Sequence, residues 1–394
     1  YLKRRENEWE ETPFTFRTKE QFWEYLDGLL LNGTALYIIG HHMAYDHALL
    51  DLDHWLSSRE FILDQFVINQ AFIIKAHKGR CSVKILDSKN WFKAALRRLG
   101  EVFGATKGEI EDFQTVSDDE LLPYCLNDAY IVRTIVLNYI DFITQHDLGN
   151  FALTAASQAF NAYRHRFMPP KTILIHGNPD AYALEQATYR GGRCDIFKQG
   201  HYEDIVKLDV NSMYPFVMHN RSYPVRPVSK GPVEGLSVHD IKQSFEQGYY
   251  VIGEFDIKLN EPFLAVKRSK LIFPIGRLVH VPMTSPEIEY LLDVGGELLK
   301  VHKAMIYEQE VIFKDYVDYF YRIKSEAKNA IMKEFSKLFL NSLYGKFGQR
   351  EYGEIAPDSS PEHEIICQSN GIGAYWVNDG AQHYKVMKIG ENYY

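Results

Sequence analysis

The stretch 207-KLDVNSMYPFVM-218 places a carboxylate where an apolar strand is expected to end. Ile205 and Leu208 predict a buried strand that leads into Asp209, and a polar turn with Tyr214 and Pro215 follows. A buried carboxylate costs desolvation free energy unless a cation or hydrogen bonds compensate it. Mg²⁺ binds one or two protein carboxylates together with phosphate oxygens. An Asp that caps the following helix explains Asp209 equally well, so this stretch alone leaves both interpretations open.

A second stretch, 333-KEFSKLFLNSLYGKFGQ-349, has the periodicity of an amphipathic helix. One face, spanning about 80°, carries Lys333, Lys337, Asn341 and Tyr344. The opposite side carries Ile331, Phe335, Leu338 and Ser342. Lysines on a helix usually form a solvated face, but a solvated face has no need of Asn341 and Tyr344. Lys324 and Lys328 would lie on the apolar side of one continuous helix, so the sequence predicts a helical hairpin that turns near Ser325.

Positive charge is concentrated in this predicted hairpin. Residues 322–350 contain seven Lys or Arg and two acidic residues, whereas the whole chain has a net charge of −8. The overall charge therefore does not indicate a nucleic-acid-binding protein. The local charge, in contrast, favours a site for a polyphosphate on the hairpin.

Three segments resemble motifs of family B DNA polymerases, in particular of the protein-primed branch found in phages, adenoviruses and linear plasmids. LDVNSMYP resembles motif A (DxxSLYP), and KLFLNSLYG resembles motif B (KxxxNSxYG). Tyr189-Arg190-Gly191-Gly192 resembles the YxGG joint between the exonuclease and polymerase domains of that family. The three segments occur in the family's order, so together they are much more specific than YxGG alone.

The resemblance implies a polymerase site that binds template and primer DNA, a deoxynucleoside triphosphate and Mg²⁺ or Mn²⁺. Asp209 would bind both metal ions, and the backbone of Val210 would bind one of them. Tyr214 would stack under the incoming sugar and exclude a 2′-hydroxyl. The other residues that the resemblance assigns to the nucleotide are Lys324, Lys333, Lys337, Asn341 and Tyr344, of which Lys337 is also catalytic. The residues that it assigns to DNA at the joint are Tyr189, Gly191 and Gly192.

The first 165 residues alternate strand and helix patterns and resemble the 3′–5′ exonuclease domain of the same family. Here 42-HMAYD-46 resembles the second exonuclease motif, and 124-YCLND-128 resembles the third (YxxxD). By this resemblance Asp46 and Asp128 would bind metal ions, and Tyr124 would orient the attacking water. Lys107 matches an auxiliary catalytic lysine of the protein-primed enzymes.

The chain departs from the family pattern at three places. His42 stands where the family usually has Asn, and with Tyr45 it would contact a single-stranded 3′ end. The first exonuclease motif (DxE) is expected ahead of Tyr1, and motif C (YxDTDS) and the thumb are expected beyond Tyr394. These 394 residues alone are therefore expected to have little or no catalytic activity. The parent gene product would be a proofreading DNA polymerase that a terminal protein primes.

The expected fold is α/β and α+β multidomain, with a ribonuclease-H-like exonuclease domain and a partial palm with helical-hairpin fingers. Strands are expected at 34–42 and 82–88, and helices at 90–104, 119–143 and 286–294. The expected domains are the exonuclease at 1–165, a linker and palm part at 166–220, and the fingers at 313–348. An insertion that contacts the priming protein, with a further palm part, is expected at 221–312, and a second insertion is expected to start at 349–394.

Other classes of protein remain as alternatives. The stretch 41-HHMAYDHALLDLDH-54 contains four His and three Asp, which is compatible with a transition-metal protein unrelated to replication. A non-catalytic fragment that binds DNA or a priming protein is a second alternative, and a ribonuclease-H-like nuclease with an unrelated C-terminal domain is a third. Four scattered cysteines without a CxxC pair indicate an intracellular reducing compartment and no structural zinc. No apolar run is long enough to cross a bilayer, so no membrane partner is expected.

Overall fold

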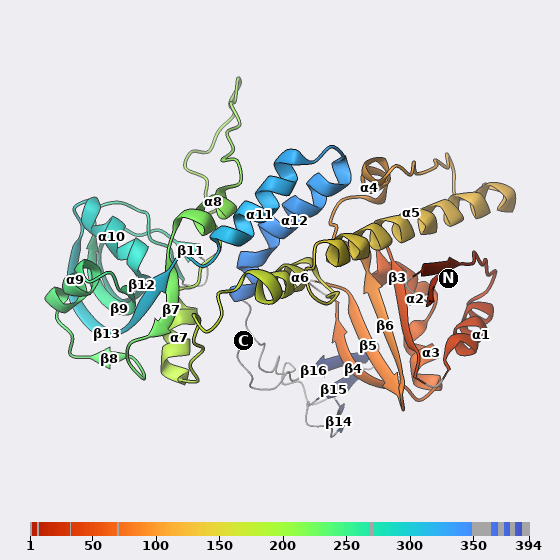
Figure 1. Cartoon of the computed structure of the whole chain (residues 1–394), viewed down its shortest axis with the longest axis horizontal. Coiled ribbons are helices and arrows are strands. Elements are labelled where there is room, and N and C mark those ends of the chain that lie inside the picture. The colour runs from red at the N-terminus through yellow and green to blue at the C-terminus, as the bar shows by residue number, and fades with distance from the viewer. Residues whose placement is uncertain are drawn as a thin grey trace. The chain divides into compact units, whose positions relative to one another are not determined.

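The computed structural model describes residues 2–5, 8–31, 33–68, 71–267 and 271–348 and the strands at 364–368, 374–378 and 383–387. The chain divides into two compact units (Figure 1). Unit 1 consists of Tyr1–Arg166 and Phe320–Tyr394, and unit 2 consists of Phe167–Tyr319. The fold is mixed α/β and α+β, as the sequence predicts. The expectations for residues 349–363, 369–373, 379–382 and 388–394 lie outside the described residues.

Unit 1 contains a four-stranded sheet in the order β3-β6-β5-β4. Its strands are β3 (Ala35–Gly40), β4 (Ile62–Val67), β5 (Ile73–Lys78) and β6 (Cys81–Asp87). β3 and β6 are parallel, whereas the other two pairs are antiparallel. The strands predicted at 34–42 and 82–88 are therefore confirmed. Side chains of α1 (Lys19–Leu29), α2 (Met43–Leu49) and α3 (Leu52–Ser58) pack with one face of this sheet in a common apolar core.

Four further helices of unit 1 are α4 (Leu96–Phe103), α5 (Asp118–Gln145), α6 (Ala155–Ala162) and α12 (Ala330–Phe347). Phe335 of α12 lies in a cluster of aromatic rings from α4, α5 and the segment before α4. Its ring centroid is 5.0 Å from that of Phe142, 5.4 Å from Tyr139 and 5.7 Å from Phe92. The apolar side of the helix predicted around residue 335 is thus packed against the helices of the amino-terminal part of the chain.

The helix predicted at 119–143 is confirmed by α5, but the helix predicted at 90–104 is wrong in its first half. Residues 88–90 form a short 3₁₀ turn, and the α-helix begins only at Leu96. Asn90 accepts a hydrogen bond from the backbone N–H of Phe72 at 2.8 Å and donates one to its carbonyl at 2.9 Å. Trp91 is buried next to it. These tertiary contacts override the helical propensity of the segment.

The predicted helical hairpin is confirmed. α11 (Lys314–Glu326) ends one residue after Ser325, and α12 begins at Ala330. The Asn329 side chain caps α12 by accepting from the backbone N–H of Met332 at 2.9 Å. The hairpin therefore has a short connection and a defined start to its second helix.

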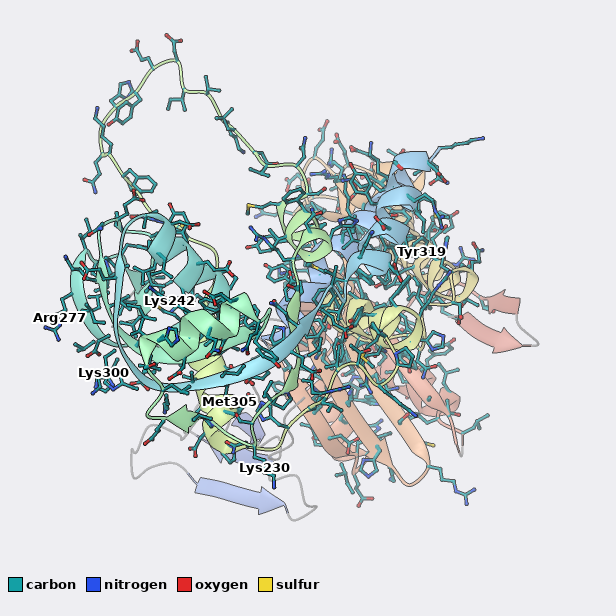
Figure 2. All side chains as sticks on the ribbon, turned by 60° about the vertical axis from the view of Figure 1, so that its left-hand side comes forward. Lys230, Lys242, Arg277, Lys300, Met305 and Tyr319 are labelled. Atoms are coloured by element: carbon teal, nitrogen blue, oxygen red, sulfur yellow. The ribbon has the colours of Figure 1, made fainter. Side chains whose placement is uncertain are left out.

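Unit 2 is built on a curved antiparallel sheet in the order β12-β9-β13-β7, with β8 also paired to β13. Its strands are β7 (Tyr223–Pro227), β8 (Val233–Glu234), β9 (Tyr250–Leu259), β12 (Gly276–Thr284) and β13 (Glu297–Glu310). The main core packs α9 (Val238–Glu246) and α10 (Ser285–Asp293) on one face. A smaller cluster with Met305 of β13 (Figure 2) packs α7 (Pro179–Thr188) on the other. The helix predicted at 286–294 is confirmed by α10.

The buried strand predicted at 205–209 is wrong. These residues have no regular structure, and the side chains of Ile205 and Leu208 are 75% and 88% exposed. Strand backbone groups need a hydrogen-bonding neighbour, and no described strand pairs with this segment. Asp209 itself is exposed. The expected helix does follow as α8 (Met213–Asn220), with Pro215 in its first turn.

The remaining elements are short. They are β1 (Leu2–Arg5), β2 (Glu8–Glu11), β10 (Val266–Lys267), β11 (Leu271–Ile272), the π-helical turn Tyr163–Phe167, and β14 (Glu364–Gln368), β15 (Ala374–Asn378) and β16 (His383–Met387). Within the described residues, none of the helices combines the length and the apolar character that a membrane span requires.

We expect Ile85→Ala to destabilise unit 1 by about 2–5 kcal/mol, because Ile85 is fully buried in the core of the four-stranded sheet. Ile62→Ala is the matched control: its side chain is 41% exposed on the edge strand β4, so the expected change is about 0.5 kcal/mol. Urea denaturation followed by tryptophan fluorescence measures both, since Trp23, Trp55 and Trp91 are buried in unit 1. Equal losses in the two variants would contradict this account of the core.

Candidate functional site

The carboxyl ends of β3 and β6 lie at the same edge of the sheet, because the two strands are parallel and Gly40 is opposite Asp87. Only two residues separate β3 from α2, which carries Asp46. A Cβ atom on Gly40 would lie 2.7 Å from the Met43 Sδ and 3.0 Å from the Asp46 Oδ2. The side chains of Met43 and Asp46 therefore approach the end of β3 closely, and a larger residue at position 40 would displace them.

His42 adopts a left-handed backbone conformation, with φ 74° and ψ 43°, at the start of α2. Its own side chain makes no capping hydrogen bond. Instead, the carboxylate of Asp87 accepts from the backbone N–H groups of His42 at 3.2 Å and of Met43 at 2.9 Å. Asn tolerates the left-handed region better than most residues, which is a physical reason for the Asn that the family usually has here.

Lys107, Tyr124 and Asp128 meet beside this edge. Tyr124 and Asp128 lie one turn apart on α5, and the Lys107 ammonium donates a hydrogen bond to the Asp128 Oδ2. The same ammonium lies 4.5 Å from the centroid of the Tyr124 ring. The second oxygen of Asp128 is buried and has no hydrogen-bond partner. A cavity of about 560 Å³ adjoins this group, and Tyr124 and Asn127 are among the residues that line it.

The charges link the two groups of residues. Burial lowers the pKa of His41, and its charged neighbours include both Asp87 and Lys107. Burial raises the pKa of Asp46, and the negative charge of Asp87 raises it further. Burial opposes the charge of Lys107, but hydrogen bonds to Asp128 and Tyr124 outweigh it and raise the pKa of Lys107. The negative charges of Asp46 and Asp87 thus repel one another at this edge of the sheet. The positive charge of Lys107 neutralises Asp128.

Asp46 and Asp128 are the acids that the sequence analysis assigns to metal binding. Across the described part of the chain, no group of three or more His, Cys, Asp or Glu side chains is arranged to hold a metal ion. Carboxylates are nevertheless the chemistry that Mg²⁺ uses, and one or two of them are sufficient because the ion keeps several waters or phosphate oxygens as ligands. The buried Oδ1 of Asp128 has no hydrogen-bond partner, and a bound metal ion or its water would provide one.

The histidines of 41-HHMAYDHALLDLDH-54 have separate surroundings. The His41 Nδ1 lies 2.8 Å from the hydroxyl of Ser88, and the ring of His54 lies 5.7 Å from that of Trp23. The ring of His47 is buried against Phe72. This arrangement does not support the alternative of a transition-metal protein centred on the stretch.

The polar residues predicted on α12 do share an exposed side of that helix. Lys333, Asn341 and Tyr344 are exposed, and Lys337 is 40% exposed. The Lys337 ammonium lies 2.8 Å from the Glu334 Oε1, so it is held in an ion pair on the same helix. Lys324 of α11 lies 5.5 Å from the centroid of the Tyr321 ring. Of the residues that the resemblance assigns to the nucleotide, those on α11 and α12 belong to unit 1, and Val210 and Tyr214 belong to unit 2.

The joint and motif A residues belong to unit 2. A Cβ atom on Gly192 would lie 3.3 Å from the hydroxyl of Tyr214, so the YxGG segment closely approaches motif A. The guanidinium of Arg190 donates to the Glu287 carboxylate and to the Pro282 carbonyl. Val210 and Tyr189 are exposed, as is Tyr45 of unit 1.

Asp87 is the residue that sequence reasoning missed. The signal was available, because an acid ends the strand predicted at 82–88. The resemblance assigns no metal ligand to this position, so the family motifs do not point to it. Its role is visible only once β3 and β6 pair.

The class of protein follows from comparison with known families. Residues 70–357 match the family described as DNA polymerase type B, organellar and viral. The match covers more than half of the chain, so the chain belongs to this family of DNA polymerases.

Individual relatives support the same assignment. The chain is 32% identical over 335 residues to the DNA polymerase of Bacillus phage PZA, which covers 76% of this chain and 54% of that protein. It is 28% identical over 290 residues to a probable DNA polymerase of Ascobolus immersus, covering 69% of this chain and 23% of that protein. The chain thus spans about a quarter to a half of the length of these relatives.

The fold is shared with a solved DNA polymerase. Phi29 DNA polymerase, solved in complex with primer–template DNA, matches 93% of this chain with a TM-score of 0.60 at 19% sequence identity, and 66% of that chain is covered. At this identity the likeness establishes the fold alone.

We expect His42→Asn to stabilise unit 1 by roughly 0.5–1 kcal/mol, because Asn adopts the left-handed conformation at lower cost than His. His54→Asn is the control, since His54 lies within the right-handed helix α3. Urea denaturation compares the two variants with the unmodified chain. An equal or larger gain from His54→Asn would show that the backbone conformation at position 42 is not the cause.

We expect Asp46→Asn to raise stability at pH 7 by roughly 1 kcal/mol, as is common when a functional charge is removed. The pKa of Asp46 is raised in the folded chain, so ionisation of this group costs stability as pH rises from its unfolded pKa through its folded pKa. The gain should therefore vanish below both pKa values, at about pH 3. Asp119→Asn, an exposed position in the first turn of α5, is the control. A gain independent of pH would contradict this origin.

Proposed function

We propose that the chain is part of a DNA-directed DNA polymerase with a 3′–5′ exonuclease, and that a protein hydroxyl primes its synthesis. Family membership supports the polymerase. The observation that supports the exonuclease is the contact of Lys107 with both Tyr124 and Asp128. Lys107 is also a charged neighbour of His41, which lies at the edge of the sheet where β3 ends and shortly before α2, the helix that carries Asp46. The resemblance assigns Asp46, Lys107, Tyr124 and Asp128 to proofreading.

Both reactions transfer a phosphoryl group, so the protein's task is to position substrates and balance charge. In the exonuclease, Asp46 and Asp128 would hold Mg²⁺ or Mn²⁺, which supplies charge neutralisation at the phosphate oxygens. Tyr124 would orient the water, and Lys107 would stay protonated beside Asp128 because its contacts raise its pKa. His42 and Tyr45, both exposed at this edge, would contact the single strand.

In the polymerase, Asp209 and the backbone of Val210 would hold the metal ions. The exposed side of α12, with Lys333, Lys337, Asn341 and Tyr344, would bind the triphosphate and base together with Lys324 of α11. Tyr214 would lie under the sugar. Its hydroxyl closely approaches Gly192, so Tyr214 lies next to the YxGG joint.

The partners that we propose are template and primer DNA, a deoxynucleoside triphosphate and a priming terminal protein. Phi29 DNA polymerase, which shares this fold, has been solved with primer–template DNA and incoming nucleotide substrates. Residues 221–312, which include the curved sheet of unit 2, are proposed as the region that contacts the priming protein. This last assignment rests on the position of the segment between motifs A and B.

The number of acids in each candidate site bears on catalysis by the 394 residues alone. Each candidate site contains fewer acids than a two-metal reaction uses, so we propose that this chain alone binds DNA and nucleotides with little turnover. The non-catalytic alternative shares this expectation and differs in what the full-length gene product does.

The full-length gene product tests the function. We expect Asp209→Ala to abolish magnesium-dependent primer extension and to leave single-strand degradation intact, because Asp209 is assigned to the polymerase alone. Asp128→Ala should have the opposite effect. Glu203→Ala and Asp119→Ala, which remove exposed acids near each position, are the matched controls. Full extension and degradation by the two site variants would overturn the proposal.

The 394-residue chain tests nucleotide binding. We expect Lys333→Gln with Lys337→Gln to weaken binding of a deoxynucleoside triphosphate by about thirtyfold, since two lysine contacts to phosphate, each on the order of 1 kcal/mol, sum to about 2 kcal/mol. Lys230→Gln with Lys242→Gln removes the same charge from unit 2 (Figure 2) and should change affinity by less than about twofold. Titration calorimetry measures both. Equal losses would indicate a general charge effect.

A further inference from the structure

We infer that Asp87 is a positioning residue for the exonuclease metal site: it holds the start of α2, and with it Asp46, in the place where Asp46 can bind a metal ion. This inference rests on the proposed exonuclease function and extends it to a residue outside the motifs. The reasons lie in the hydrogen bonds of Asp87, in the backbone that it holds and in the short distance along the chain to Asp46.

Asp87 has the surroundings of a structural carboxylate rather than of a metal ligand. Its side chain is 7% exposed, and its oxygens accept three backbone N–H groups, from His42, Met43 and Lys89, at 3.2, 2.9 and 2.8 Å. Charged acceptors of several N–H groups are stable when buried. With its oxygens engaged in this way, Asp87 is suited to fix backbone geometry rather than to bind a cation.

The backbone that Asp87 holds is the one that determines where Asp46 lies. The first N–H groups of a helix have no partner within the helix, and the N-cap residue His42 provides no side-chain cap. Asp87 provides the cap from a different strand, 45 residues away in sequence from His42. It thereby compensates the left-handed conformation of His42, which costs about 1 kcal/mol for most residues other than Gly, Asn and Asp.

Asp46 is only three residues beyond Met43, whose N–H group Asp87 binds. Its carboxylate lies against Gly40, the residue paired with Asp87 in the parallel ladder. A shift at the start of α2 would therefore move Asp46 directly. Removal of groups that orient metal ligands typically weakens metal binding 10–100-fold.

The test is Mn²⁺ affinity of the 394-residue chain, measured by electron paramagnetic resonance in an Asp209→Ala background that removes the other candidate metal acid. Asp87→Asn should weaken Mn²⁺ binding about tenfold, because an amide presents an N–H group where backbone N–H groups need an acceptor. Asp256→Asn is the matched control. Asp256 is 8% exposed and also accepts from the backbone N–H of a left-handed histidine, His280 with φ 55°, but it lies in unit 2. It should change the affinity less than twofold.

A rescue separates positioning from a loss of general stability. Because Asn favours the left-handed conformation, Asp87→Asn with His42→Asn should recover about threefold of the lost Mn²⁺ affinity. If Asp87→Asn does not fold, Asp87→Ser, which keeps one acceptor, replaces it and should weaken Mn²⁺ binding by an intermediate factor. Hydrogen exchange at the amides of His42 and Met43 should accelerate in either variant.

Two outcomes overturn the inference in different ways. If Asp46→Asn and Asp128→Asn leave Mn²⁺ affinity unchanged, the exonuclease assignment fails, and this inference fails with it. If those two variants weaken Mn²⁺ binding but the folded Asp87 variant binds like the unmodified chain, the function stands and the positioning role of Asp87 is wrong.

Discussion

The parallel pairing of β3 with β6 is the constraint on which the candidate exonuclease site depends. It puts Gly40 opposite Asp87 and brings the ends of both strands to one edge of the sheet. Because only His41 and His42 connect β3 to α2, the chain must turn sharply, and it does so through the left-handed His42. The carboxylate of Asp87 stabilises this turn from the neighbouring strand. Asp46 is thus placed by strand register rather than by a long loop.

A second constraint is the packing of α12. The helix exposes Lys333, Asn341 and Tyr344 on one side and buries Phe335 among the aromatic rings of α4 and α5 on the other. The residues proposed to bind a nucleotide are therefore mounted on a helix whose apolar side belongs to the core of unit 1. Sites on packed helices are held more rigidly than sites on loops. The opposed polarity of the two sides explains why one helix can contribute to both a core and a binding surface.

Sequence reasoning succeeded where a local pattern is sufficient. The 3.6-residue period of α12 and the position of the hairpin turn near Ser325 follow from side-chain spacing alone. The four-residue spacing of Tyr124 and Asp128 correctly predicts that they share a side of α5. The predicted strand at 205–209 and the predicted helix at 91–95 are both absent from the structure. In the first case a strand pattern has no described partner, and in the second the buried Trp91 and the hydrogen bonds of Asn90 replace a helix.

The sequence by itself determined the family, the helices with a clear apolar side and the identity of the motif residues, because each depends on residue type and spacing within a short segment. Only the tertiary structure decided that Asp87 caps α2, that Lys107 binds Asp128 and that position 42 is left-handed. The two hydrogen bonds connect residues that are 21 to 45 positions apart in sequence. The conformation of His42 depends on the turn between β3 and α2. No local periodicity encodes them, since they arise from the register of a parallel ladder and from the packing of α5 beside it.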